Sequence, residues 1–189
     1  MKYLKAKMFN RKAADLRNKP DQILEILQLK EDQNVVDIGA GGGYFSLRFA
    51  TAVGSKGKVY AVDTNPEFLE FISNTAIAKG LSNIVAVLAK EDSLGLPEGS
   101  IDLVFMRNVY HHLQNRVEYF RRLSRLLMSN GKVAIIEYKR GGCFSFRRLF
   151  GHHIPVEIII REVTDAGLKL DMRYDFLPEQ FFTIFSLKR

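Results

Sequence analysis

The chain has 189 residues and a hydrophobic fraction of 47%, which suits one domain with a sizeable core. No apolar stretch approaches the ~20 residues of a membrane-spanning helix, and the first residues lack the apolar segment of a signal peptide. The one cysteine, Cys143, excludes an internal disulfide and fits a reducing, cytoplasmic setting. Because no Cys/His cluster has zinc spacing, we expect no metal site.

The net charge of +7 is carried by two short stretches of the chain. Residues 1–19 have a net charge of +6, and residues 139–153 have a net charge of +4. The remaining residues sum to −3, so the basic character does not belong to the whole surface. Two local basic segments suit an anionic partner.

Apolar periodicity predicts strands and helices that alternate along the chain. A helical region around Ile23, Ile26 and Leu27 comes first, and Pro20 suits its first turn. Strands are expected near 34–38, 58–62, 84–88, 101–106, 132–138, 168–176 and 181–187, and helices near 44–53, 66–79, 115–127 and 155–167. This alternation indicates a doubly wound, three-layer α/β fold.

Several expected boundaries carry residues that favour them. Asn65 is suited to cap the helix that Pro66 begins, and Gly80 follows the end of that helix. The dipeptide Asn130-Gly131 is expected to separate the helix near 115–127 from the strand after it. The last two strands are joined by residues 177–180 alone, which is hairpin length, so one strand must run antiparallel to the rest.

The most informative segment runs from Val35 to Ser46, where an apolar strand leads into glycines and then into a helix. Glycines stand at 39, 41 and 43 after Asp37, and the next strand ends on Asp63, 20 residues after Gly43. This is the layout of a nucleoside-binding βαβ unit. Glycines let the backbone approach a ligand closely, and the acid of the second strand accepts hydrogen bonds from ribose hydroxyls.

Three kinds of ligand compete for such a turn. A phosphate-binding P-loop ends in Gly-Lys-Ser/Thr, and no Lys follows these glycines. A dinucleotide turn needs a small third residue where this chain has Tyr44. The pattern acid-x-Gly-x-Gly-x-Gly from Asp37 instead resembles motif I of the class I S-adenosylmethionine-dependent methyltransferases. The resemblance implies S-adenosylmethionine as the cofactor, with its aminoacyl end over the glycines.

Further motifs of that family follow in the same order. Asp92-Ser93 stands where the family places the pair at the adenine edge, and Leu96-Pro97 and residues 101–104, Ile-Asp-Leu-Val, come next. The resemblance extends over residues 20–189 and is greatest to the methyltransferases of ubiquinone/menaquinone biosynthesis and of arsenite. Arsenite methylation is disfavoured, because that subgroup uses several cysteines and this chain has one.

The resemblance also implies an architecture. The family has a mostly parallel, seven-stranded sheet in the order 3-2-1-4-5-7-6, with an antiparallel last strand, and we expect it here. Residues 1–189 are then one methyltransferase domain, in which residues 1–30 form a helical lid over the acceptor pocket.

The cofactor-binding positions of the family match residues throughout the first half of this chain. They are Asp37, Gly39, Ala40, Gly41, Gly43, Tyr44, Asp63, Thr64, Asn65, Asp92, Ser93 and Asn108. His111 matches a histidine that the group places after the fourth strand, either as a general base or as a residue that only packs or caps. Methyl transfer depends more on in-line positioning than on proton removal. Asp102 opens the fourth strand, so we expect it at the end away from the ligand.

Contacts to the acceptor are expected from Tyr110, His112, Arg140, Arg147 and Arg148. A basic, aromatic lid suits a small acceptor that is anionic or lipophilic, or a peripheral contact with an anionic membrane; a solvated basic face is the alternative. The pI of about 9.5 leaves an RNA methyltransferase open, although no added RNA-binding module is recognisable. A cofactor-binding protein without activity is the remaining alternative.

Overall fold

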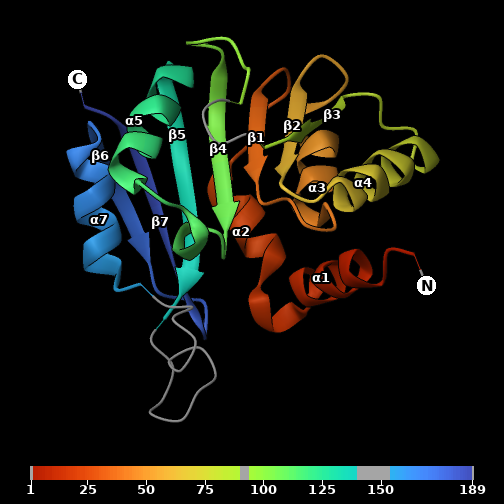
Figure 1. Cartoon of the computed structure of the whole chain (residues 1–189), viewed down its shortest axis with the longest axis horizontal. Coiled ribbons are helices and arrows are strands. Elements are labelled where there is room, and N and C mark those ends of the chain that lie inside the picture. The colour runs from red at the N-terminus through yellow and green to blue at the C-terminus, as the bar shows by residue number, and fades with distance from the viewer. Residues whose placement is uncertain (1, 90–93, 140–153, 189) are drawn as a thin grey trace.

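The computed structural model describes residues 2–89, 94–139 and 154–188, whose strands form one sheet (Figure 1). The strands are β1 (Asn34–Ile38), β2 (Lys58–Asp63), β3 (Ile84–Leu88), β4 (Ile101–Arg107), β5 (Leu127–Tyr138), β6 (Leu168–Tyr174) and β7 (Gln180–Leu187). Their order is β3-β2-β1-β4-β5-β7-β6. Pairing is parallel from β3 to β5, whereas β7 runs antiparallel to β5 and β6. The predicted order and directions are confirmed.

Helices cover both faces of this sheet. They are α1 (Leu4–Ala14), α2 (Pro20–Leu27), α3 (Tyr44–Val53), α4 (Pro66–Ala78), α5 (Arg116–Leu126) and α7 (Val156–Asp165). α2 and α3 pack on one face, α5 and α7 pack on the other, and α4 lies against β2 and β3. Among the described helices, none combines the length and the apolar character that a bilayer crossing requires.

The core is divided between the two faces because successive residues of a strand point in opposite directions. Phe105 of β4 packs against Phe45 and Phe49 of α3, with ring centroids 5.0 and 5.1 Å away. Its neighbours on β4, Val104 and Met106, join the cluster on the face of α5 and α7. All five side chains are buried. Burial contributes roughly 1.5–3 kcal/mol for a large apolar side chain, so the central strands are held firmly from both sides.

The ends of the helices confirm one expected boundary and correct another. Asn65 caps α4 by accepting the Glu67 N–H at 2.9 Å, as expected. Asn130-Gly131, however, does not separate a helix from a strand, because α5 ends at Leu126 and β5 already begins at Leu127. The glycine is needed inside β5, where a Cβ at position 131 would lie 2.7 Å from the Ile101 carbonyl oxygen. The pairing of β4 with β5 shifts register at this point.

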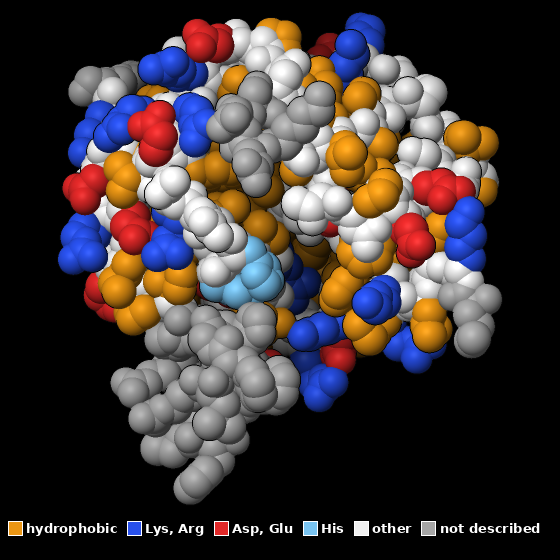
Figure 2. Space-filling view, viewed as in Figure 1, with side chains coloured by type: hydrophobic (Ala, Val, Ile, Leu, Met, Phe, Trp, Pro, Cys, Tyr) orange, Lys and Arg blue, Asp and Glu red, His pale blue; other side chains and the backbone are white. Residues whose placement is uncertain are grey.

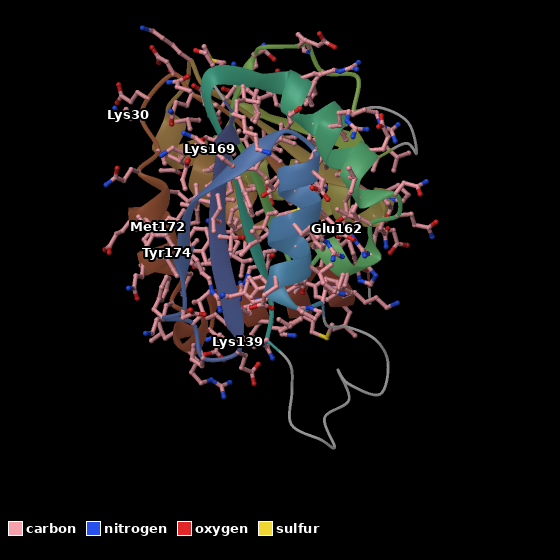
Figure 3. All side chains as sticks on the ribbon, turned by 90° about the vertical axis from the view of Figure 1, so that its left-hand side faces the viewer. Lys30, Lys139, Glu162, Lys169, Met172 and Tyr174 are labelled. Carbon is pink, nitrogen blue, oxygen red and sulfur yellow. The ribbon has the colours of Figure 1, made fainter. Side chains whose placement is uncertain are left out.

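β6 forms one edge of the sheet, and its side chains are largely exposed (Figure 3). Met172 is half exposed, and Lys169 and Arg173 place charge on the same strand. The Arg173 guanidinium lies 3.3 Å from the Asp175 carboxylate. Charged side chains along an edge strand disfavour the addition of a further strand. The sheet therefore ends at β6.

α1 lies beyond the carboxyl ends of β1 and β2, at the lower right of Figure 1. Phe9 of α1 makes an edge-to-face contact with Phe68 of α4, with centroids 5.6 Å apart. The Asn10 side chain donates to the Gly42 carbonyl oxygen at 2.8 Å and accepts the Tyr44 N–H at 3.1 Å. These contacts attach the first helix directly to the glycine turn between β1 and α3.

Candidate functional site

A cavity of about 1350 Å³ opens at the carboxyl ends of the parallel strands (Figure 2). Its walls come from α1, the glycine turn, the ends of β1, β2, β4 and β5, and the segment before α5. A pocket for one small ligand measures roughly 300–1000 Å³. The cavity therefore has room for two small molecules side by side, which a group-transfer reaction requires.

The glycine turn forms one wall, and its backbone explains why glycines stand there. Gly39, Gly41 and Gly43 have φ values of +69°, +55° and +79°, which residues other than glycine rarely adopt. A Cβ at Gly39 would overlap Val109, and one at Gly43 would overlap Ile72. At Gly41, in contrast, the nearest atom would be in Phe9 at 3.6 Å. Gly39 and Gly43 are thus needed for packing, and Gly41 leaves room beside the cavity.

The carboxylate of Asp63 links β2 to this turn. One oxygen accepts the Gly41 N–H and the other accepts the Asn65 N–H, both at 2.9 Å. An ionised carboxylate has about four lone-pair sites, so Asp63 retains capacity for donors on a ligand. Asp63 and Thr64 both line the cavity. Asn65 caps α4 instead and is not among the lining residues.

Asp37 is the buried acid of the site, with 4% of its surface exposed. The pKa of its carboxyl group is raised to about 7, chiefly by burial and also by the charge of Asp63. The hydrogen bond from the Ser46 hydroxyl acts in the opposite direction and lowers the pKa. It lines the same wall as Gly41. A bound cation would favour the ionised form of Asp37.

His111 lies on the opposite side, in a short 3₁₀ helix (Tyr110–His112) that follows β4. Its Nδ1 is 3.0 Å from a carboxylate oxygen of Glu137, at the end of β5. Glu137 is fully buried, and its other oxygen accepts the Tyr138 N–H at 2.9 Å. The His111 side chain is 6% exposed, and the ring of His112 lies 4.0 Å from it. The carboxylate fixes the orientation of the imidazole ring.

Glu137 was not among the residues singled out by the sequence. A signal was present, because Glu137 is an acid near the end of the otherwise apolar run Val133-Ala134-Ile135-Ile136. In this architecture, ligands bind at the carboxyl ends of strands. An acid in that position therefore deserved the same weight as Asp63.

Tyr110 is the expected acceptor contact that the structure does not bring to the cavity. Its side chain is fully buried and stacks on Phe120 with centroids 5.5 Å apart. Its hydroxyl donates to Glu162 of α7 at 2.6 Å, and burial raises the pKa of the phenol. Tyr110 therefore packs the 3₁₀ helix onto α5 and α7. Gly43 is likewise placed against α4 rather than in the cavity wall.

The remaining predicted residues fall into three groups. Ala40, Tyr44, Asn108 and His112 line the cavity, and their contacts to a ligand stay a prediction. Asp92, Ser93, Arg140, Arg147 and Arg148 lie outside the described residues. Asp102 lies at the opposite end of β4, where its carboxylate accepts the Asn34 N–H at 2.8 Å and so supports the start of β1.

Further lining residues carry polar groups that sequence reasoning missed, among them Asn10, Lys12, Arg107 and Tyr138. Asn10 and Lys12 come from α1, Arg107 ends β4, and Tyr138 ends β5. Arg107 directly precedes Asn108, so its place at a strand end was visible in the sequence. The family resemblance implied that residues 1–30 form a lid, but nothing in the sequence singled out Asn10 and Lys12 as the residues of that lid that line the cavity.

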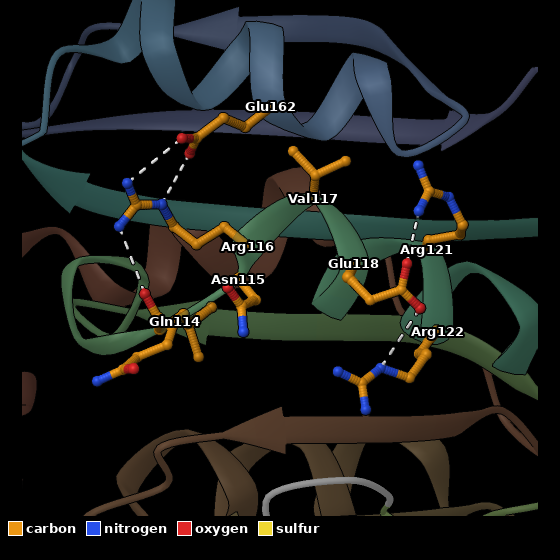
Figure 4. A pocket seen from close by; sticks show the side chains of 9 residues that line it. Gln114, Asn115, Arg116, Val117, Glu118, Arg121, Arg122 and Glu162 are labelled. Carbon is orange, nitrogen blue, oxygen red and sulfur yellow. Dashed lines mark hydrogen bonds and ion pairs between the residues drawn. The ribbon is translucent and has the colours of Figure 1, made fainter.

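A smaller hollow of about 510 Å³ lies between α5 and α7 (Figure 4). Its charged groups pair with one another: Arg116 Nε lies 2.7 Å from Glu162, and Arg121 pairs with Glu118. Burial alone would raise the pKa of Glu162, but the bonds from Arg116 and Tyr110 hold it below its usual range. The paired charges stabilise the contact of α5 with α7, and we assign no ligand to this hollow.

Within residues 2–89, 94–139 and 154–188, no group of three or more His, Cys, Asp or Glu side chains could hold a metal ion.

The sheet order and the strand–glycine–helix turn with Asp63 define the class of the protein. This is the fold of the class I S-adenosylmethionine-dependent methyltransferases, and S-adenosylmethionine is the cofactor of the class. A family model described as "Methyltransferase domain" matches residues 29–166. The chain therefore belongs to the methyltransferase-domain family.

Curated relatives match the chain over part of their length. It is 27% identical to the uncharacterized methyltransferase YcgJ of Bacillus subtilis over 61% of this chain and 45% of the relative. It is 29% identical to the aklanonic acid methyltransferase DauC of Streptomyces sp., over 66% of this chain and 57% of the relative. The chain spans about half the length of the curated relatives it matches.

A solved structure shares the whole fold. A SAM-dependent methyltransferase from Aquifex aeolicus superposes with a TM-score of 0.85 over 97% of both chains, at 22% identity. At this identity the likeness establishes the fold.

Proposed function

We propose that this chain transfers a methyl group from S-adenosylmethionine to a small acceptor that is anionic or lipophilic. The observation that carries the proposal is a single cavity, large enough for two ligands, with different chemistry at its two ends. The glycine turn with Asp37 and Asp63 forms what we call the cofactor half. Lys12, Arg107, His111 and Tyr138 line what we call the acceptor half, and the buried Glu137 supports it from behind His111.

In the cofactor half, Gly39, Ala40 and Gly41 allow close approach of the ligand to the backbone. Asp63 accepts hydrogen bonds from ribose hydroxyls, and Asp37 faces the cationic, amino-acid end. Tyr44, Thr64 and Asn108 complete the wall. The bound cofactor supplies a methyl group that is already activated by a sulfonium. The protein has to hold the two partners in line and exclude water.

In the acceptor half, His111 removes the proton from an acceptor atom that carries one. Glu137 accepts from Nδ1, which leaves Nε2 as the atom that takes the proton. The buried carboxylate also stabilises the imidazolium that forms. His112 lines the same side of the cavity and contributes to the shape of the acceptor pocket.

Residues 1–30 act as a lid over this cavity. Phe9, Asn10, Lys12 and Ala13 line it, and Asn10 bonds to the glycine turn at two backbone groups. The lid separates the reacting groups from bulk water. Together with residues 31–189 it forms one domain.

The curated relatives support a small acceptor in general terms. Two of them are named for ubiquinone/menaquinone biosynthesis and for aklanonic acid. Those names describe the relatives, and the acceptor of this chain is to be identified by its own chemistry.

Isothermal titration calorimetry tests the cofactor without knowledge of the acceptor. We expect S-adenosylmethionine and S-adenosylhomocysteine to bind, and NADH to bind at least about tenfold more weakly, because Tyr44 fills the place of the small residue that a dinucleotide turn needs. Tighter binding of NADH would move the protein to the oxidoreductases. Absence of binding by both adenosyl ligands would end the proposal.

A further inference from the structure

Arg107 occupies an unusual position for a cationic side chain. It is the last residue of β4, lines the cavity, and its guanidinium carbon lies 5.5 Å from the centre of the Phe45 ring. One terminal nitrogen donates to the Gln180 side chain at 3.1 Å. Its Nε is shielded from solvent and has no hydrogen-bond partner within the described part of the chain.

No carboxylate compensates this charge among the described residues, where none lies within 4.0 Å of the guanidinium. The acids that line the cavity are Asp37 and Asp63, and the hydrogen bonds described for them are within the cofactor half. Burial lowers the pKa of Arg107, but a guanidinium stays protonated in proteins. A shielded cation without a counterion is costly, and an anionic ligand in the cavity would offset that cost.

A second cation reaches the same end of the cavity from α1. Lys12 Nζ donates to the Tyr138 hydroxyl at 2.8 Å and lies 5.3 Å from the centre of that ring. The phenol groups of Tyr138 and Tyr44 both act to raise the pKa of Arg107, against the effect of burial. β4 and β5 are neighbours, with Arg107 opposite Ile136, two residues before Tyr138. Figure 2 shows blue basic side chains in the hollow beside the pale blue histidines.

We propose that Arg107, with Lys12 and the Tyr138 hydroxyl, forms a binding subsite for a carboxylate. A guanidinium fork matches a carboxylate in two parallel hydrogen bonds. This inference rests on the proposed function and narrows it: the group bound at this end of the cavity is a carboxylate. A carboxylate reaches the subsite from two sources, the acceptor itself or the amino-acid end of S-adenosylmethionine.

Calorimetry with two pairs of probes separates these sources. S-adenosylhomocysteine carries the cofactor carboxylate, and 5′-methylthioadenosine lacks it. Benzoate carries an acceptor-like carboxylate, and benzamide is its neutral counterpart of the same shape. The first pair is titrated into the free protein, and the second pair is titrated into protein saturated with S-adenosylhomocysteine. Each titration uses the parent chain, Arg107→Met, Arg107→Lys and Lys12→Met.

If the acceptor supplies the carboxylate, the parent binds benzoate about tenfold more tightly than benzamide, and Arg107→Met removes this preference. Affinity for S-adenosylhomocysteine then changes less than about twofold. If the cofactor supplies it, Arg107→Met weakens S-adenosylhomocysteine about tenfold and leaves 5′-methylthioadenosine unchanged. Arg107→Lys is expected to recover part of the loss in either case, because it keeps the charge without the planar fork.

Two controls keep the test decisive. Arg125→Met removes an exposed arginine at the far end of α5 and should leave all four affinities unchanged. Lys12 is exposed on α1, so Lys12→Met should fold normally and lower the affected affinity about threefold even if the Arg107 variants do not fold. If Arg107→Met and Lys12→Met bound both S-adenosylhomocysteine and benzoate as tightly as the parent, the subsite would be overturned. Failure of the parent to bind either adenosyl ligand would instead overturn the proposed function.

Discussion

The two halves of the cavity are built in different ways. In the cofactor half, a turn of three glycines with positive φ and the carboxylate that bonds to Gly41 all lie between residues 37 and 63. In the acceptor half, His111 meets Glu137 across 26 positions, and Lys12 meets Tyr138 across 126. A local stretch of chain thus encodes one half, and only the assembled fold creates the other. A local motif therefore predicts the cofactor, whereas the residues of the acceptor half come together only in the folded chain.

The largest effect should come from breaking the cofactor half at its backbone. Gly41→Val places a branched side chain at φ +55°, beside the cavity, and should abolish binding of S-adenosylhomocysteine in calorimetry. Gly80→Val is the matched control, because Gly80 has a similar φ of +69° and no neighbouring atom within 4 Å of an added Cβ. If Gly41→Val bound S-adenosylhomocysteine as tightly as Gly80→Val, the ligand would not lie against Gly41.

A smaller loss should follow from removing the carboxylate that holds the turn. Asp63→Ala removes a charged acceptor worth about 1.5–3 kcal/mol, which corresponds to about a tenfold to 150-fold weaker affinity for S-adenosylhomocysteine. The variant also leaves the N–H groups of Gly41 and Asn65 without this partner. Asp171→Ala changes the same charge on exposed β6 and should have no effect. Parent-like affinity in Asp63→Ala would remove Asp63 from the ligand contacts.

A double-mutant cycle tests whether Glu137 holds His111 in place in the acceptor half. His111→Ala, Glu137→Ala and the double variant are compared by urea unfolding, and the free energies of unfolding should show a coupling of about 0.5–3 kcal/mol. The buried pair is 3.0 Å apart, so each residue should matter less once the other is gone. The exposed pair Ser186 and Asp171, 2.9 Å apart, should couple by less than about 0.5 kcal/mol. Additive effects at His111 and Glu137 would show that the carboxylate does not hold the imidazole.

The smallest expected effect is a change in pH dependence caused by Asp37. In the folded chain its carboxyl keeps a proton up to about pH 7, whereas the ordinary pKa is 3.8. The unfolded chain therefore binds fewer protons between these values, and this group lowers stability as pH rises through that window. Asp37→Asn should flatten the fall of the melting temperature between pH 5 and pH 7.5, measured without ligand.

Ser46→Ala supplies the matched comparison for Asp37. The Ser46 hydroxyl donates to Asp37 and lowers its pKa, so its removal should extend the loss of stability to higher pH. A pH profile of Asp37→Asn that is identical to the parent would contradict the raised pKa.

Most of the fold could be predicted, because its signals are local. Asn65 and Pro66 begin α4 as their capping chemistry requires, and hairpin length alone implied the antiparallel β7. The boundary predicted at Asn130-Gly131 was wrong for a physical reason. Gly131 is suited to a turn, but it is required here because the Ile101 carbonyl oxygen lies too close for a Cβ. Its neighbour across the sheet lies 30 positions away, beyond the reach of any local pattern.

The candidate site likewise contains residues that local spacing predicts and residues whose place depends on packing. The lining by Gly39, Gly41 and Asp63 followed from spacing, because short-range geometry brings these residues together. Tyr110 was predicted as an acceptor contact because it follows β4. In the 3₁₀ helix, however, Tyr110 points toward Glu162, whereas the next residue, His111, points toward the cavity. Such a rotation is decided by packing on α5 and α7, which no motif encodes.

The place of β7 in the sheet has a consequence for how the protein is made. β7 is the last strand along the chain, yet it lies between β5 and β6 and supplies the fully buried Phe182 and Phe185. During synthesis the outer edge of β5 has no partner until residues 180–187 leave the ribosome. Until then Phe185 is missing from one face of the core and Phe182 from the other. A nascent chain that stalls before this strand therefore exposes an unpaired, apolar edge, which is the kind of surface that chaperones bind and that aggregation begins from.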